Sequence, residues 1–190
     1  MNLLRFDAGL IAIACLSSAS ATWAAPFAQT LTLQQVTFTV KAQGDGSKQE
    51  LVVEAKDGSL LLPTIHQPVG GMVTSAEVQD LNSDGKPELV LSLVSAGIGC
   101  YGSVLAWSVS KGHTLLPINM PELTSVQAQG YMGQDRFAVV ETTLARQFPI
   151  YRPGDSNAKP TGGIRQIDYK LVAGEASFQF KPVRMTDTTQ

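Results

Sequence analysis

An acidic loop with regularly spaced oxygen side chains offers the first chemistry in this sequence. Over the nine residues 80–88, oxygen-bearing side chains occupy the first, third, fifth and ninth positions: Asp80, Asn82, Asp84 and Glu88. Gly85 permits a sharp turn at the sixth position, and the Lys86 carbonyl is available at the seventh. Calcium takes six to eight oxygen ligands from loops with spacing of this kind. One interpretation is therefore a structural calcium site formed by Asp80, Asn82, Asp84, Lys86 and Glu88.

The same loop has a second interpretation. It is not an EF-hand, because the twelfth position is Leu91, where that motif requires a bidentate glutamate. It is more similar to the calcium loops of FG-GAP and VCBS β-repeats, which end in an acid and lead into an apolar strand. Those proteins carry several copies, whereas this chain has one. Asp and Asn side chains also accept hydrogen bonds from their own backbone, so an Asx-rich turn that caps the next strand is the alternative.

A glycine-rich run follows the next apolar segment. Gly97, Gly99 and Gly102 lie within six residues, and glycine permits positive φ and tight or protruding turns. The run matches the dinucleotide pattern G-x-G-x-x-G, but that site needs a helix to begin there, and residues 104–109, VLAWSV, are typical of a strand. A protruding turn that carries Tyr101 into solvent is the better interpretation, and it suits insertion into a partner.

Catalytic motifs are not evident. The sequence has no G-x-S-x-G elbow, and His66 and His113 are the only histidines that could serve as a base or as zinc ligands. The formal net charge is −2, from 14 basic and 16 acidic residues, and no basic cluster is interleaved with aromatic residues. This balance is not typical of nucleic-acid binding. We therefore predict a protein that is not an enzyme and has no nucleic-acid partner.

Short strands are predicted to hold these loops in place. Alternation of apolar and polar residues and regular turn signals give candidate strands at 31–40, 50–55, 59–62, 72–79, 88–95, 101–110, 135–148, 163–172 and 176–183. Residues 88–95 are apolar on one face and largely apolar on the other, which suits a central strand. The predicted fold is all-β, a single-domain antiparallel β-sandwich or barrel-like fold with an exposed glycine-rich loop.

Four connections complete this prediction. A phase slip at Gln34–Gln35 is interpreted as a β-bulge inside one strand. Residues 63–71 are predicted to form a loop, and Pro121 is placed to open one short helix. Residues 149–162 contain three prolines and are predicted to form an ordered loop, either functional or a crossover between strands.

The start of the chain has the three parts of a secretory signal peptide. Arg5 precedes an apolar run at 8–16, and small residues follow. The run is too short for a membrane span, and cleavage after Ala21 or after Ala24 satisfies the small-residue rule. We predict a signal peptide at 1–24 and a periplasmic β domain at 25–190, without membrane insertion.

Cys100 would be the one cysteine of the mature protein, because Cys15 lies in the predicted signal peptide. A lone cysteine in an oxidising compartment either stays unpaired or links two chains. The two alternatives are an unpaired thiol and a disulfide-linked homodimer.

Two stretches resemble the periplasmic inhibitors of i-type (invertebrate-type) lysozyme, the PliI-like family. The first is Asp80 to Gly102, DLNSDGKPELVLSLVSAGIGCYG. The second lies between Tyr131 and Glu175 and contains YMGQDRFAVVE, ARQFPIYRPGDSNAKPTGG and YKLVAGE. The resemblance implies a β-sandwich-like fold in the periplasm, no cofactor, and an i-type lysozyme as the protein partner, whose cleft is blocked by an inserted loop.

In that family the inserted loop reads approximately S-A-G-S-G-S-Y-G. The resemblance implies a lysozyme-binding loop made of Ser95, Gly97, Ile98, Gly99, Cys100, Tyr101 and Gly102, with residues 149–162 as a rim. Ile98 and Cys100 stand where serines are expected. A serine hydroxyl can hydrogen-bond a catalytic carboxylate, whereas isoleucine would leave a buried carboxylate unpaired. The alternative function is therefore a periplasmic ligand- or calcium-binding module that kept the fold without inhibiting lysozyme.

Overall fold

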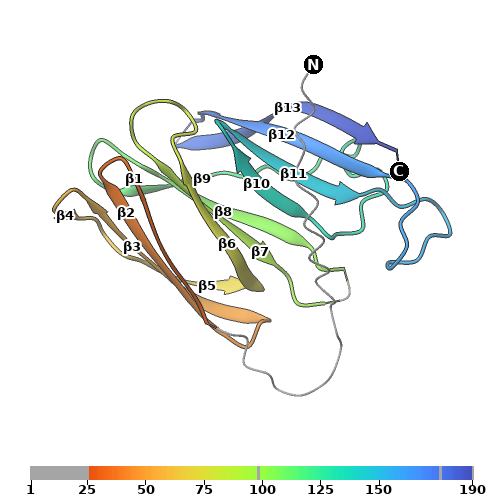
Figure 1. The fold of residues 1–190 in the computed structure, drawn as a ribbon, viewed down its shortest axis with the longest axis horizontal. Coiled ribbons are helices and arrows are strands. Elements are labelled where there is room, and N and C mark those ends of the chain that lie inside the picture. The colour runs from red at the N-terminus through yellow and green to blue at the C-terminus, as the bar shows by residue number, and fades with distance from the viewer. Residues whose placement is uncertain (1–25, 98, 176, 190) are drawn as a thin grey trace.

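The computed structural model describes residues 26–97, 99–175 and 177–189, which form three antiparallel β-sheets (Figure 1). These residues contain strands, turns and loops but no helix, so the all-β prediction is confirmed. In this part of the chain no helix has the length and apolar character needed to cross a membrane. The predicted signal peptide with its cleavage sites, and Ile98 of the glycine-rich run, lie outside the described residues.

The strands of each sheet follow one another along the chain. The first sheet contains β1 (Phe27–Leu33), β2 (Val36–Gly44), β3 (Lys48–Asp57), β4 (Leu60–Leu61) and β5 (Ile65–Gly70), with both β4 and β5 paired to β3. The middle sheet contains β6 (Met72–Gln79), β7 (Glu88–Val94), β8 (Gly102–Val109) and β9 (Leu115–Ile118). The third sheet contains β10 (Arg136–Val140), β11 (Thr143–Pro149), β12 (Ile164–Ala173) and β13 (Phe178–Thr188).

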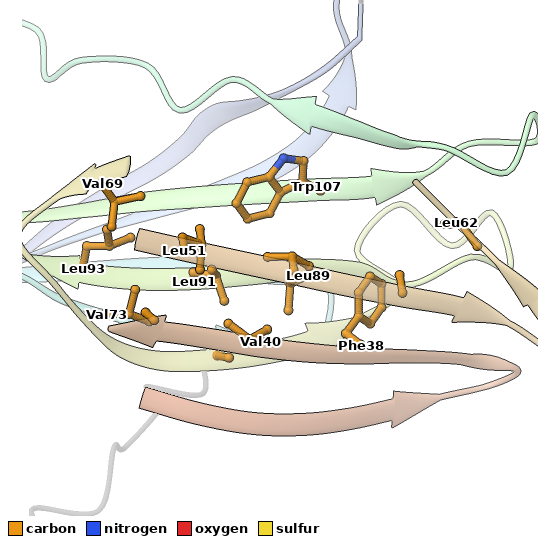
Figure 2. Close-up of a cluster of buried hydrophobic side chains, with 14 of the residues drawn as sticks. Phe38, Val40, Leu51, Leu62, Val69, Val73, Leu89, Leu91, Leu93 and Trp107 are labelled. Atoms are coloured by element: carbon orange, nitrogen blue, oxygen red, sulfur yellow. The ribbon is translucent and has the colours of Figure 1, made fainter. Parts of the chain in front are cut away.

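The middle sheet lies between the other two and contributes to two hydrophobic cores. On one face, Leu89 and Leu91 pack with Phe38 and Leu51 of the first sheet (Figure 2). On the other face, side chains of the middle and third sheets meet, among them Val90, Val104, Leu144, Ile167 and Tyr169. Because β7 alternates between the two cores, residues 88–93 are all buried. The predicted central strand is confirmed, and its two apolar faces are explained by two covering layers.

The middle and third sheets are also joined at their edges. Beyond β9, Asn119 donates its N–H to the Phe178 carbonyl at 3.0 Å and accepts from the Phe180 N–H at 2.9 Å. At the opposite edge, the Glu77 carboxylate on β6 accepts the Val139 N–H of β10 at 3.0 Å. These bonds satisfy strand-edge groups that would otherwise be unpaired, so the two sheets enclose the second core like a flattened barrel.

Two of the predicted strand boundaries are wrong for the same reason. Gln34–Gln35 is the turn of a two-residue hairpin that joins β1 to β2, not a bulge in one strand. Residues 135–148 likewise contain β10 and β11, joined at Glu141–Thr142. Gln34 has φ 55° and Glu141 has φ 53°. Glycine or asparagine normally takes such left-handed positions, so neither turn carries the usual sequence signal.

Two other connections differ from the prediction. Residues 63–71 include β5, in which Pro68 is tolerated because β5 is an edge strand paired only to β3. The helix predicted at Pro121 is absent. Instead, residues 125–130 form turns, in which the Ala128 N–H donates to the Thr124 carbonyl at 2.8 Å.

Candidate binding site at the glycine-rich tip

The glycine-rich run forms the connection from β7 to β8, which we call the tip (residues 95–101). It is closed at its base, where the Ser95 N–H donates to the Tyr101 carbonyl at 2.8 Å and the Tyr101 N–H donates to Ser95 Oγ at 3.1 Å. The Cys100 N–H donates to the Gly97 carbonyl at 3.3 Å. Tyr101 is 49% exposed. Residues 95–101 thus turn the chain from β7 to β8 and leave Tyr101 exposed.

A row of aromatic rings connects the tip to the second core. The Tyr101 ring lies 5.7 Å from the Tyr131 ring, and Tyr131 lies 4.8 Å from Phe148, both in edge-to-face contact. Phe148 is fully buried. Edge-to-face pairs place the positive edge of one ring on the negative face of the next. Tyr101 is thus held on one side by packing and keeps its other side in solvent.

A buried ion pair lies beneath the tip. Arg146 Nε donates to Asp135 Oδ1 at 2.7 Å, and the Gly102 N–H donates to Asp135 Oδ2 at 2.8 Å. Tyr131 Oη donates to the same Oδ2 at 2.5 Å and accepts from Arg146 Nη2 at 3.1 Å. A buried carboxylate with this many donors is well compensated for its lost hydration. The pair therefore fixes the start of β8, and with it one end of the tip.

Burial and the ion pair together shift the pKa values of Tyr131 and Arg146. Burial raises the pKa of Tyr131 far above its usual range, and the Asp135 carboxylate raises it further, so the phenol stays protonated and donates. Burial alone lowers the Arg146 pKa, but the charge and hydrogen bond of Asp135 more than offset this effect and raise it. Both groups therefore keep their roles across the physiological pH range.

Residues 131–135 pass directly under the tip. Gly133 has φ 93°, and a Cβ there would lie 2.0 Å from the Gly99 carbonyl oxygen, so only glycine permits this approach. The next amide, Gln134 N–H, donates to the carbonyls of Gly99 and Cys100 at 3.1 Å each. The tip is therefore supported by backbone contact as well as by the ion pair.

The loop predicted as a rim lies beside this support; we call residues 152–161 the rim loop. Gln134 Nε2 donates to Tyr151 Oη at 2.8 Å and to the Asn157 carbonyl at 2.9 Å. Asp155 closes the loop, because it accepts the N–H groups of Arg152 at 2.7 Å and Thr161 at 2.8 Å. The Arg152 hydrogen bond and the Thr161 hydrogen bonds lower the Asp155 pKa. The rim loop is thus an ordered structure.

The predicted site residues have different roles in the structure. Gly97, Gly99 and Tyr101 lie on the tip, whereas the Gly102 N–H is used internally by Asp135 and is not available to a partner. The sulfur of Cys100 is disulfide-bonded, so the unpaired thiol predicted as one alternative is wrong.

The acidic loop lies at the other end of β7 from the tip and is folded around its own oxygen atoms. Asp80 accepts the N–H groups of Asp84 at 3.1 Å and Gly85 at 3.0 Å. Asn82 Oδ1 also accepts the Asp84 N–H, and Asp84 accepts the Lys86 N–H at 2.8 Å. These bonds are those of an Asx-rich turn. The side chains that were candidates for calcium already satisfy the backbone of a tight loop.

Glu88, the proposed ninth-position ligand, points into the protein. It is fully buried, accepts the Leu81 N–H at 2.7 Å and accepts the Ser108 hydroxyl at 2.8 Å. Burial raises the Glu88 pKa to about 7. Lys86 Nζ lies 2.6 Å from Asp57 Oδ2, which places a cation close to the loop.

Both oxygens of the closing acid, Glu88, accept hydrogen bonds within the protein, from the Leu81 N–H and the Ser108 hydroxyl. Across residues 26–97, 99–175 and 177–189, no group of three or more His, Cys, Asp or Glu side chains is arranged to hold a metal ion.

The support beneath the tip was not predicted from the sequence. Tyr131, Gln134, Asp135 and Arg146 belong to segments that were used to assign a strand and the family resemblance, and none of the four was a predicted site residue. The available signal was a pair of opposite charges, Asp135 and Arg146, in a stretch predicted to form one long strand. Recognising them as a pair required the hairpin at Glu141, which brings β10 and β11 side by side.

Comparisons with known proteins add no family or relative. No protein-family model matches this chain, and a search of curated proteins gives no match either.

Proposed function

We propose that this protein is a periplasmic inhibitor of i-type lysozyme that inserts its tip into the active-site cleft of the enzyme. The observation that carries this proposal is the combination of an exposed tip with a rigid, buried base. Tyr101 is 49% exposed, while the residue after it is fixed by the Asp135–Arg146 pair. The sequence resemblance over residues 80–102 and 131–175 supports the choice of partner.

A fixed protrusion binds a concave site at lower cost than a mobile loop. Ordering side chains and backbone on binding costs free energy, and a loop that is already ordered in the free protein avoids most of that cost. The base hydrogen bonds, the contact with Gly133 and the aromatic row hold Ser95, Gly99 and Tyr101 in place before any partner binds. Tyr101 supplies the rigid, amphipathic side chain that often dominates an interface.

We propose that fewer residues contact the lysozyme than the seven of the binding loop implied by the family resemblance. Gly97, Gly99 and Tyr101 are proposed to enter the cleft, and Gly102 acts as a positioning residue. Small residues on both sides of the tyrosine let the backbone approach the partner closely. The tip carries no charged side chain, so backbone N–H groups and the Tyr101 hydroxyl are its donors to the catalytic carboxylates of the enzyme.

The test is a titration of the purified mature protein into i-type, c-type and g-type lysozymes, with hydrolysis of bacterial cell walls as the readout. We expect stoichiometric loss of activity with the i-type enzyme alone. Unchanged activity of all three enzymes would refute the proposal. Ile98→Ser restores the family residue, and a gain in inhibition would show that the natural side chain limits binding.

The alternative, a calcium-binding module, predicts a different result. Calcium would then raise the melting temperature and a chelator would lower it, by mass action on the folded state. Because Glu88 points into the protein and is bonded there, we expect neither calcium nor a chelator to change the melting temperature.

A further inference from the structure

The rim loop presents positive charge next to an uncharged tip. Its ionisable side chains are Arg152, Asp155 and Lys159. Asp155 directs its carboxylate to the Arg152 N–H and to the N–H and hydroxyl of Thr161. Arg152 and Lys159 are exposed. The nearby Asp135 is buried and neutralised by Arg146. The rim loop thus carries two exposed cations and one half-buried carboxylate that is bonded within the loop.

Gln134 holds the rim loop and the tip in one arrangement. Its backbone N–H donates to Gly99 and Cys100 of the tip, while its side-chain amide donates to Tyr151 Oη and to the Asn157 carbonyl. Tyr151 is buried and also donates to the Asn157 carbonyl at 3.0 Å. Gln134 itself has φ 61°, an unfavourable conformation for a non-glycine residue. Such a conformation persists only where the surrounding contacts fix it.

We propose that the tip and the rim loop form one docking surface, positioned by Gln134, in which Arg152 and Lys159 of the rim loop select an acidic cleft for the tip. This inference rests on the proposed function and specifies the chemistry of the partner. Glycoside-hydrolysing enzymes act through paired carboxylates in a cleft. A tip without charged side chains does not compensate that charge, whereas two cations on the adjoining rim loop attract the cleft and speed the encounter.

The first test reverses the two rim-loop charges. The double variant Arg152→Glu, Lys159→Glu is compared with Lys56→Glu, Lys181→Glu, which makes the same change in net charge at two exposed lysines outside the docking surface. Inhibition of i-type lysozyme is measured at low and high salt. We expect the rim variant to inhibit at least about tenfold more weakly at low salt, with a smaller difference at high salt because salt screens exposed charges. The control should stay within about twofold of the natural protein.

The second test removes the Gln134 side chain and keeps its backbone amide. In Gln134→Ala we expect inhibition to weaken about tenfold, with its salt dependence unchanged. Amide hydrogen exchange should become faster in both the rim loop and the tip, while the melting temperature changes little. Faster exchange confined to the rim loop would show that the two loops are not coupled, and would overturn the positioning role.

The outcomes separate this inference from the proposed function. If the natural protein inhibits but the rim variant inhibits equally well at low salt, the acidic-cleft inference is wrong and the inhibitor proposal stands. If the natural protein inhibits no lysozyme, both are wrong.

Discussion

At the scale of single residues, the candidate site depends on which side chains are exposed and which are committed inside. Tyr101 is half exposed, whereas the N–H of the next residue, Gly102, donates to Asp135 inside the protein. The same contrast holds in the acidic loop, where Glu88 is fully buried although its spacing suggested a metal ligand. Residue type and spacing identify the candidates, and the direction of each side chain decides the role.

Replacing Tyr101 with alanine tests the proposed anchor. We expect inhibition to weaken at least about 30-fold, because truncating an anchor residue typically costs about 2 kcal/mol or more. The melting temperature should change little, since the ring is half exposed. Leu61→Ala is a matched control, because Leu61 is an apolar side chain that is 67% exposed on another strand, β4. Equal inhibition by the two variants would show that Tyr101 is not the anchor and that lysozyme binds another surface.

Glu88→Gln tests the effect of the buried carboxyl group on stability. Burial raises the Glu88 pKa from 4.5 to about 7 in the folded protein. The folded state therefore binds more protons than the unfolded state between these values, and the free energy of unfolding falls as pH rises through this window. A pKa difference of one corresponds to about 1.4 kcal/mol, so the free energy of unfolding should fall by on the order of 3 kcal/mol across this window.

Urea unfolding between pH 5 and pH 8 measures this effect. The glutamine variant should gain stability relative to the natural protein as pH rises to about 7, and the difference should be constant above that. A stability difference between the two proteins that does not depend on pH would contradict the raised pKa of Glu88.

At the scale of elements, the site is made by three segments that converge beneath one turn. The tip rests on residues 131–135, the ion pair comes from β11 and the residue before β10, and the rim loop follows β11. Arg165 on β12 strengthens this end of the molecule, since it donates to the carbonyls of residues 126, 127 and 129 and pairs with Asp187. An exposed turn is thus held by contacts from buried strands.

Gly133→Ala should displace the tip. The new Cβ would meet the Gly99 carbonyl oxygen at 2.0 Å, in a residue whose φ is 93°. Gly85→Ala is the control, because Gly85 has φ 85° and open space around a Cβ. Both variants bear a backbone penalty of about 1–2 kcal/mol, but only Gly133→Ala should lose inhibition, by about tenfold or more. Equal inhibition by both variants would show that the approach of residue 133 does not position the tip.

At the scale of the whole molecule, one sheet serves two cores. The strand β7 gives Leu89 and Leu91 to the first core and Val90 to the second, so neither outer sheet packs independently of the other. The tip extends from the end of this doubly buried strand. The part of the molecule proposed to bind is therefore attached to its most enclosed element.

Sharing of β7 predicts cooperative unfolding. Leu91→Ala in the first core and Leu144→Ala in the second should each destabilise the protein by about 2–5 kcal/mol. The fluorescence of Trp107, which packs in the first core, and the circular dichroism of all the strands should change at the same urea concentration in both variants. Separate transitions in Leu144→Ala would show that the two cores unfold independently.

The sequence predicts those features that rest on strong local signals. The apolar run of β7 and the glycines of the tip both follow from residue type. The hairpin turns at Gln34 and Glu141 could not be predicted, because a left-handed glutamine or glutamate is unfavourable by itself and is held by strand pairing. The Asp135–Arg146 pair depends on the second of these turns, so it was missed for the same reason.

The claim that the tip enters the lysozyme cleft is tested most directly by competition for that cleft. Amide hydrogen exchange of the tip is measured with i-type lysozyme alone, and again with a saturating N-acetylglucosamine oligosaccharide bound to the enzyme. We expect lysozyme to protect residues 97–101 from exchange and the oligosaccharide to remove this protection. Protection that persists with the cleft filled by sugar would contradict the claim.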